Sequence, residues 1–139
     1  MKQLKRTGVY KASNVEFNPI TISAYSYDHW KFVSVINGLV VFNGYRYSST
    51  TARHQAKVMH LMVSLGIKID LHIETRYSLA TSYALDDAYD VVSKQVQELE
   101  DKIINPRSKK ALASERIAAL QVLLETRSKI YALQGRKAA

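Results

Sequence analysis

The pattern of hydrophobic and polar positions changes its period once along the chain. The stretch IKIDLHIET, Ile67 to Thr75, alternates strictly between apolar and polar residues, which predicts a strand with one buried face. From about Ser78 onward, apolar residues recur every three or four positions, which predicts a long helix. The members of this helical stripe are Leu85, Ala88, Val92, Val96, Leu99 and Ile103. A β-rich first part is therefore followed by a helical second part.

The segments before Ile67 predict short strands joined by turns. GVYKASNVEFN, ITISAYSY, WKFVSVI and LVVF are rich in β-branched and aromatic residues. Asn37-Gly38 and Asn43-Gly44 are both strong hairpin signals, because their residues accept a positive φ. Two such turns predict a meander over residues 30–48. A bulge at Gly44 within one longer strand is the alternative.

A helix over residues 51–65 follows a run of four hydroxyl residues, Ser48 to Thr51. Hydroxyl side chains are favoured N-caps, and we expect Thr50 and Thr51 to serve here. Gly66 is a natural stop. This helix should pack against the meander.

A second long helix completes the chain. Asn105-Pro106 should end the first helix and Ser108 should cap the next. The apolar stripe continues at Ala113, Ile117, Leu120, Leu124 and Tyr131. Two helices joined by a short loop form an antiparallel hairpin, and about 27 residues each would span roughly 40 Å. The sheet cannot cover so long a seam, so we expect a homo-oligomer through the hairpins; a hairpin folded back over the sheet is the alternative.

These elements define an α+β fold. It consists of an N-terminal antiparallel β-meander with one packed helix and a following strand, and then a long C-terminal antiparallel helical hairpin. The expected domains are residues 1–76, the β-rich part, and residues 77–139, the oligomerising hairpin.

The 139-residue chain has a formal net charge of +8, distributed unevenly. Residues 1–76 carry +6, residues 77–106 carry −4 and residues 107–139 carry +6. Such an excess favours anionic partners, although solubility alone is a sufficient explanation. No apolar run approaches a membrane span, and neither cysteine nor a secretory signal is present. We therefore expect a cytoplasmic protein without a membrane partner.

Catalytic and metal-binding motifs do not stand out. His29, His54, His60 and His72 lack the spacing of a metal site, and no phosphate-loop or nucleophile-elbow motif occurs. Three carboxylates, Asp86, Asp87 and Asp90, lie early in a helix, where the dipole favours them. We expect neither an enzyme nor a metal or other cofactor.

Binding features are better represented. Tyr45 and Tyr47 share one strand face with Arg46 opposite, although such tyrosines also suit ordinary β-packing. Arg53 and Arg76 lie near helix starts, where cations are unfavourable unless an anion or a carboxylate offsets them. The candidate ligand-binding residues are Arg46, Tyr47, Arg53, His54, Lys57 and Arg76. The alternative is a nucleic-acid surface that includes Lys109, Lys110 and Arg116.

The segment YRYSSTTARHQ, Tyr45 to Gln55, with the LGI strand after it, resembles a small family of phage-encoded proteins of unassigned function. A β-sheet followed by oligomerising helices is also similar in architecture to the Thoeris anti-defence sponges. These resemblances imply a non-enzymatic anti-defence oligomer in the host cytoplasm that sequesters an anionic nucleotide-type ligand. Nucleic acid or a host protein is the alternative partner.

Overall fold

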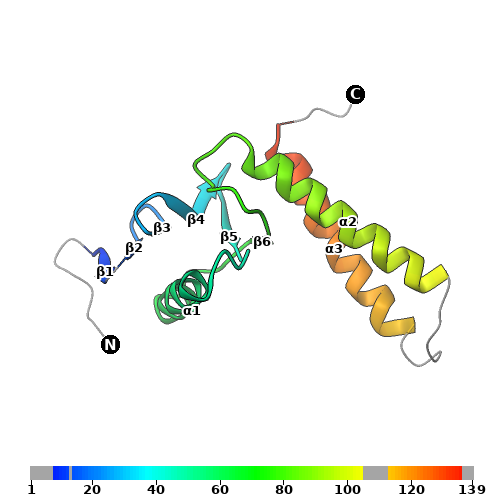
Figure 1. The fold of residues 1–139 in the computed structure, drawn as a ribbon, viewed down its shortest axis with the longest axis horizontal. Coiled ribbons are helices and arrows are strands. Elements are labelled where there is room, and N and C mark those ends of the chain that lie inside the picture. Colours follow the sequence, from blue (N-terminus) through cyan, green and yellow to red (C-terminus); the bar gives the residue numbers. More distant parts are fainter. Residues whose placement is uncertain (1–7, 13, 105–112, 136–139) are drawn as a thin grey trace.

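The computed structural model describes residues 8–12, 14–104 and 113–135. It contains a six-stranded sheet, a helix packed on that sheet and a C-terminal helical hairpin (Figure 1). The predicted α+β class is confirmed. The strands are β1 (Tyr10–Ala12), β2 (Val15–Asn18), β3 (Ser23–Ser26), β4 (Trp30–Ile36), β5 (Leu39–Asn43) and β6 (Leu71–Ile73); the helices are α1 (Ser49–Ser64), α2 (Ala84–Ile104) and α3 (Ala113–Leu133).

The sheet follows chain order from β1 to β6. Strands β1 to β5 form an antiparallel meander, whereas β5 and β6 are parallel, with Val41 opposite Leu71. A parallel pair needs a crossover, and α1 supplies it. The predicted turn at Asn37-Gly38 is confirmed, since φ is 48° at Asn37 and 80° at Gly38. Because β5 and β6 are parallel, their carboxyl ends lie at the same end of the sheet.

The predicted second turn at Asn43-Gly44 is wrong. Strand β5 ends at Asn43, and residues 45–48 form no strand. Asn43 is fully buried, and its side chain bonds to Thr75, which follows β6, as well as to the N–H of Tyr45. Gly44 N–H donates to the carbonyl of Ile73 at 2.9 Å, which extends the link between β5 and β6. The Asn-Gly pair here ends a strand.

Helix α1 begins two residues earlier than the sequence predicts. Its N-cap is Ser48, whose hydroxyl accepts the Thr51 N–H at 3.1 Å. The expectation that Thr50 and Thr51 cap the helix is therefore wrong. Thr51 is buried instead, with its hydroxyl 3.4 Å from that of Ser26 on β3.

Strand β6 is shorter than the alternating stretch that predicts it. Leu71 and Ile73 are buried while His72 and Glu74 are exposed, so the predicted alternation is confirmed. The residues before Leu71 serve as a connection: Ile67 N–H bonds to Met62 at the end of α1, and the Asp70 backbone and carboxylate both bond to Val40.

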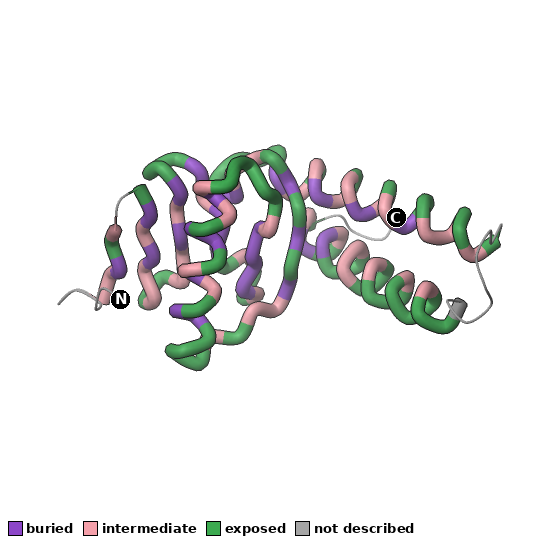
Figure 2. The backbone as a smooth tube through the Cα atoms, turned by 60° about the horizontal axis from the view of Figure 1, so that its bottom comes forward, coloured by how far each residue is buried: buried purple, intermediate pink, exposed green. Residues whose placement is uncertain are grey.

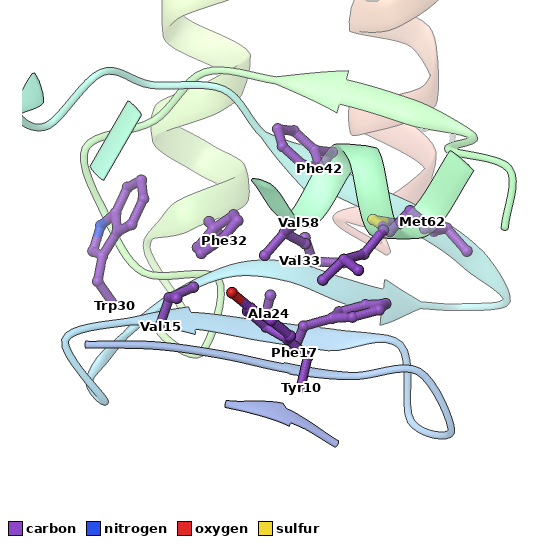
Figure 3. Close-up of a cluster of buried hydrophobic side chains, with 12 residues drawn as sticks. Tyr10, Val15, Phe17, Ala24, Trp30, Phe32, Val33, Phe42, Val58 and Met62 are labelled. Atoms are coloured by element: carbon purple, nitrogen blue, oxygen red, sulfur yellow. The ribbon is translucent and has the colours of Figure 1, made fainter. Parts of the chain in front are cut away.

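The first hydrophobic core lies between the sheet and α1 (Figure 3). Phe32 of β4 packs edge-on against Phe42 of β5, with ring centroids 5.9 Å apart. Val58 and Met62 of α1 are fully buried and point toward the sheet. Trp30 stacks on Phe32 at 6.0 Å and closes one end of this core.

The second core joins the base of the hairpin to β5 and β6. Val41, Leu71 and Ile73 pack with Ala84, Ala88 and Val92 of α2 and with Ile130 and Leu133 of α3. Beyond this base the two helices extend away from the sheet, in contact with each other (Figures 1 and 2). The hairpin is confirmed, and it does not fold back over the sheet.

The apolar stripe of α2 is confirmed in outline, since Ala88, Val92 and Val96 are buried. In α3 the buried residues are Ile130 and Leu133, which the predicted stripe does not include. Ile117 and Leu124, which it does include, are exposed. Apolar residues occur on more than one side of α3, so periodicity alone did not identify the buried side. The predicted break at Asn105-Pro106 and the cap at Ser108 lie outside the described residues.

Candidate ligand-binding site

The candidate site is built around the buried side chain of Asn43. Its Nδ2 donates to the carbonyl of Thr75 at 2.8 Å and to that of Tyr77 at 3.3 Å. Its Oδ1 accepts the N–H groups of Thr75 and Tyr45, both at 3.1 Å. One side chain therefore joins the loop after β5 to the loop after β6.

Helix α1 fixes the loop after β5 through Gln55. The Gln55 Nε2 donates to the carbonyls of Asn43 at 2.8 Å and Tyr45 at 2.9 Å. The Thr75 hydroxyl adds a further link, since it donates to the Asp87 carboxylate of α2 at 2.7 Å. Buried polar groups with this many partners restrain the backbone closely.

The loop after β6 is also attached to the start of β4. Lys31 N–H donates to the Ser78 hydroxyl at 2.9 Å, and Leu79 N–H donates to the Lys31 carbonyl at 2.8 Å. Trp30 Nε1 donates to the Arg76 carbonyl at 3.1 Å. The start of α1, the start of β4 and the ends of β5 and β6 are thus gathered at one end of the sheet.

Several aromatic side chains project from these two loops. The Trp30 ring lies 5.7 Å from the Tyr47 ring, which lies 6.4 Å from Tyr45. In the loop after β6, Tyr77 and Tyr83 have ring centroids 5.8 Å apart. Tyr47 is 64% exposed and Tyr83 is 65% exposed, so these rings present free faces to solvent. We call Tyr45, Tyr47, Arg76, Tyr77 and Tyr83 the aromatic patch.

Arg76 is the cation of this patch. Its guanidinium lies over the Tyr77 ring, 5.1 Å from the centroid, and donates to the Tyr77 hydroxyl at 3.0 Å. This hydrogen bond raises the pKa of Arg76 further above its ordinary value, and Tyr77, Asp87 and Tyr45 add to the effect. Arg76 forms no ion pair with a carboxylate of the described residues, although the charge of Asp87 contributes to its raised pKa.

The structure brings together only some of the predicted ligand-binding residues. The Tyr47 ring and the backbone carbonyl of Arg76 both contact Trp30, and Arg46 is exposed in the same loop as Tyr47. Arg53 and Lys57 lie one turn apart on α1, with Arg53 exposed and Lys57 half-buried. These two belong to the helix rather than to the aromatic patch.

His54 is turned toward the sheet. Its Nδ1 is 2.8 Å from the hydroxyl of the fully buried Ser26, and its ring lies 5.5 Å from that of Tyr27. Burial lowers the pKa of the imidazole, and the neighbouring Arg53 charge lowers it further. This environment favours a neutral histidine that supports the fold over one that holds an anion.

A cavity of about 640 Å³ lies elsewhere, between α1, β6 and the hairpin. None of the predicted ligand-binding residues lines it. Its charged side chains are Glu74, Glu98 and Lys102, a balance that does not favour an anion. We call this cavity the groove.

The predicted nucleic-acid surface is described only in part. Arg116 is half-buried on α3 and donates to the Lys102 carbonyl at 3.3 Å. Lys109 and Lys110 lie outside the described residues. Over the described ranges no group of three or more histidines and carboxylates is arranged to hold a metal ion.

The sequence did not identify Tyr77, Tyr83 or Trp30 as site residues. The segment RYSLATSY, Arg76 to Tyr83, carries a visible signal, because it repeats the arginine, tyrosine and hydroxyl residues of the loop after β5. That similarity indicated two helix starts. Only the structure shows that both segments lie at the same end of the sheet.

Comparison with known proteins adds no relative: no family model, no curated protein and no solved structure matches this chain. No helix in the described ranges combines the length and apolar character needed to cross a membrane.

Proposed function

We propose that this protein is a non-enzymatic binding protein that captures an anionic, nucleotide-type ligand on the aromatic patch. The supporting observation is that Trp30 bonds to the backbone carbonyl of Arg76, an exposed cation, and also contacts the exposed Tyr47 ring. Tyrosine rings stack on bases, and a guanidinium binds phosphate through paired hydrogen bonds. A nucleotide offers both of these groups.

The arrangement suits binding because the patch is already assembled. Asn43 and Gln55 hold the Tyr45 backbone, and Asn43 and Trp30 hold the backbone on both sides of Arg76. A ligand would then order few additional groups, which limits the entropy lost on binding. Stacking contributes about 1–3 kcal/mol per base and the charged hydrogen bonds about 1.5–3 kcal/mol each.

Trp30 supplies a direct assay. It is the single tryptophan of the chain, and its ring touches that of Tyr47, so its fluorescence should change when a base stacks there. We would titrate the protein with AMP, with ATP and with a short oligothymidylate across a series of salt concentrations. Saturable quenching by a nucleotide supports the proposal; unchanged fluorescence together with no heat of binding in calorimetry contradicts it.

Matched variants locate the site. Tyr47→Ala and Arg76→Ala should each weaken binding, whereas Arg127→Ala on α3 removes an equal charge from a remote position and should not. A steep salt dependence, with a slope of about 0.7 per phosphate contacted, would identify single-stranded nucleic acid as the ligand. Equal losses for Arg76→Ala and Arg127→Ala, with no loss for Tyr47→Ala, would show that net charge, rather than the patch, drives binding.

The resemblance to phage-encoded proteins predicts a wider role, as an anti-defence sponge in the host cytoplasm. This role stays a prediction. Mass spectrometry of small molecules released from the denatured, salt-washed protein would test it, because a sponge purified from cells that make its signal should release a stoichiometric nucleotide.

A further inference from the structure

The chain contains two Asn-Gly pairs, Asn37-Gly38 and Asn43-Gly44, in opposite surroundings. Asn37 and Gly38 form the turn between β4 and β5, and both are exposed. No hydrogen bond to another described residue involves the Asn37 side chain or the Gly38 N–H. Apart from its chain neighbours, no atom of the described residues lies within 4 Å of the position that a Gly38 Cβ would occupy. The Asn37 amide and the next backbone nitrogen therefore both lie open to solvent.

An asparagine followed by glycine can lose its side-chain amide without an enzyme. The glycine nitrogen gives its proton to a base in solvent and attacks the asparagine Cγ. The Cγ–Nδ2 bond then breaks, and ammonia leaves with a proton returned by solvent. The product is a five-membered succinimide ring, which water opens at either carbonyl to give aspartate or isoaspartate. Glycine favours this attack because it has no side chain to obstruct it.

We propose that Asn37 is a site of spontaneous deamidation in this protein, and that the fold protects Asn43 from the same reaction. Attack at Asn43 requires the nitrogen of Gly44, whose N–H donates to the carbonyl of Ile73 at 2.9 Å. The Asn43 amide is itself fully buried, and both its Nδ2 and its Oδ1 bond to Thr75. The structure must open locally before these groups can react, and the rate falls with the population of that open state.

The other asparagines have less reactive successors. Asn18 and Asn105 each precede a proline, which has no N–H to lose. Asn14 precedes Val15, whose β-branched side chain obstructs the attack. Among the described asparagines, Asn37 is therefore the one that combines a glycine successor with exposed reacting groups.

Conversion would change the turn in two ways. Isoaspartate adds a methylene group to the main chain, which does not fit the two-residue turn that pairs Ile36 with Leu39. Either product also carries a negative charge that asparagine lacks. Ile36 and Leu39 pack against the second core, at the base of the hairpin, so the longer main chain should loosen that core. The turn precedes β5 and the aromatic patch follows it, so ligand binding should persist.

The first test compares the two asparagines within one protein. Native protein is incubated at mildly alkaline pH, digested with trypsin and analysed by tandem mass spectrometry. Asn37 and Asn43 both lie between Lys31 and Arg46, so one tryptic peptide carries both, and its fragment masses show which has converted. In the folded protein we expect Asn37 to convert at least about 100-fold faster than Asn43, because only Asn43 needs a local opening. In concentrated urea the two should convert at similar rates.

Three outcomes of this test would overturn the proposal. They are equal rates at the two sites in the folded protein, no conversion of Asn37, and conversion of Asn37 that is as strongly slowed by folding as that of Asn43.

The second test uses variants at position 37. Asn37→Gln keeps an amide but would have to form a larger ring, so it should stop the conversion; an unchanged rate at this turn would overturn the assignment. Asn37→Asp has the new charge without the extra methylene. Ion exchange isolates the converted wild type, which should unfold at a lower urea concentration than Asn37→Asp, and equal midpoints would contradict the loosening of the second core. These outcomes are independent of the aromatic patch, whose ligand binding is measured separately.

Discussion

The indole of Trp30 connects two loops that lie far apart in the sequence. Its Nε1 donates to the backbone carbonyl of Arg76 at 3.1 Å, while its ring lies 5.7 Å from that of Tyr47. A single buried side chain thus links the backbone of Arg76 to the Tyr47 ring, two residues to which we assign ligand binding.

Two substitutions distinguish a residue that positions the loops from a residue that contacts the ligand. Trp30→Phe keeps an aromatic ring but removes the donor, so the unfolding free energy should fall by about 1–3 kcal/mol as the Arg76 carbonyl loses its partner. Tyr47→Ala removes an exposed ring and should change stability by less than about 0.5 kcal/mol, while ligand affinity falls by about 1–3 kcal/mol. Urea denaturation and calorimetry measure the two quantities. A Tyr47→Ala protein that binds as tightly as the wild type would remove Tyr47 from the site.

Asn43 should be the most sensitive polar position in the sheet. Asn43→Leu keeps a similar volume but leaves the carbonyl of Thr75 and the N–H groups of Thr75 and Tyr45 without their partner. Unsatisfied buried groups cost about 1–3 kcal/mol each, so we expect a loss of several kcal/mol. Asn18→Leu, which removes hydrogen bonds from an exposed turn, is the control and should cost far less. Equal losses of unfolding free energy in the two variants would show that the hydrogen bonds of Asn43 contribute no more to stability than those of Asn18.

Substitution of the glycine by alanine should have different effects in the two Asn-Gly pairs. Gly38 has a φ of +80° with no atom near its missing Cβ, so Gly38→Ala should cost about 1–2 kcal/mol through backbone strain alone. Gly44 has no positive φ, and its nearest neighbour is the Ile73 carbonyl oxygen at 3.9 Å. Gly44→Ala should therefore be close to neutral. Thermal unfolding measures the stability of both variants. A larger loss of stability for Gly44→Ala than for Gly38→Ala would contradict this prediction and favour a hairpin turn at Asn43-Gly44.

His54 should make the protein sensitive to mild acid. Burial, and then the Arg53 charge, lower the pKa of His54 in the folded state below the 6.5 of an unfolded chain. The unfolded state therefore binds the proton first, so stability is fully present above pH 6.5 and falls as the pH drops toward the lowered folded pKa. The ring contacts Ser26 and Tyr27, neither of which is a carboxylate.

The measurement is the unfolding free energy as a function of pH, for wild type and for His54→Gln. The wild type should lose more stability than the variant between neutral pH and about pH 5. Exposed His60, substituted in the same way, is the control. Parallel curves for the wild type and the His54 variant would show that this histidine titrates equally in both states.

The helical half could be predicted because the spacing of its apolar residues involves only near neighbours in the sequence. Leu85 to Ile103 repeats at helical spacing, and the structure places Ala88, Val92 and Val96 inside as that spacing requires. The turn at Asn37-Gly38 is local in the same sense. The error at Asn43-Gly44 arose because the side chain of Asn43 bonds to Thr75 and Tyr77, more than thirty positions later, and no local signal contains that preference.

The candidate site was predicted only in part for the same reason. Tyr47 was recognisable from its residue type near a helix start, whereas the expectation that Arg76 lies near one is wrong, since α2 begins only at Ala84. The Tyr47 ring and the Arg76 backbone both contact Trp30 because β5 pairs in parallel with β6, and the sequence did not reveal this pairing. His54 looked similar to Arg53 in sequence, yet one helical step of about 100° turns it into the interior.

The parallel β5–β6 pair also sets an order of assembly. It joins residues thirty positions apart, Val41 to Leu71, whereas the meander closes through turns of a few residues. The longer loop is entropically harder to close, so this pair should form after the meander. Tyr47 and Arg76 meet only in that step. During synthesis on the ribosome, a chain that has emerged only as far as α1 would carry a nearly finished sheet, and the surface to which we assign ligand binding would form only after β6 has joined it.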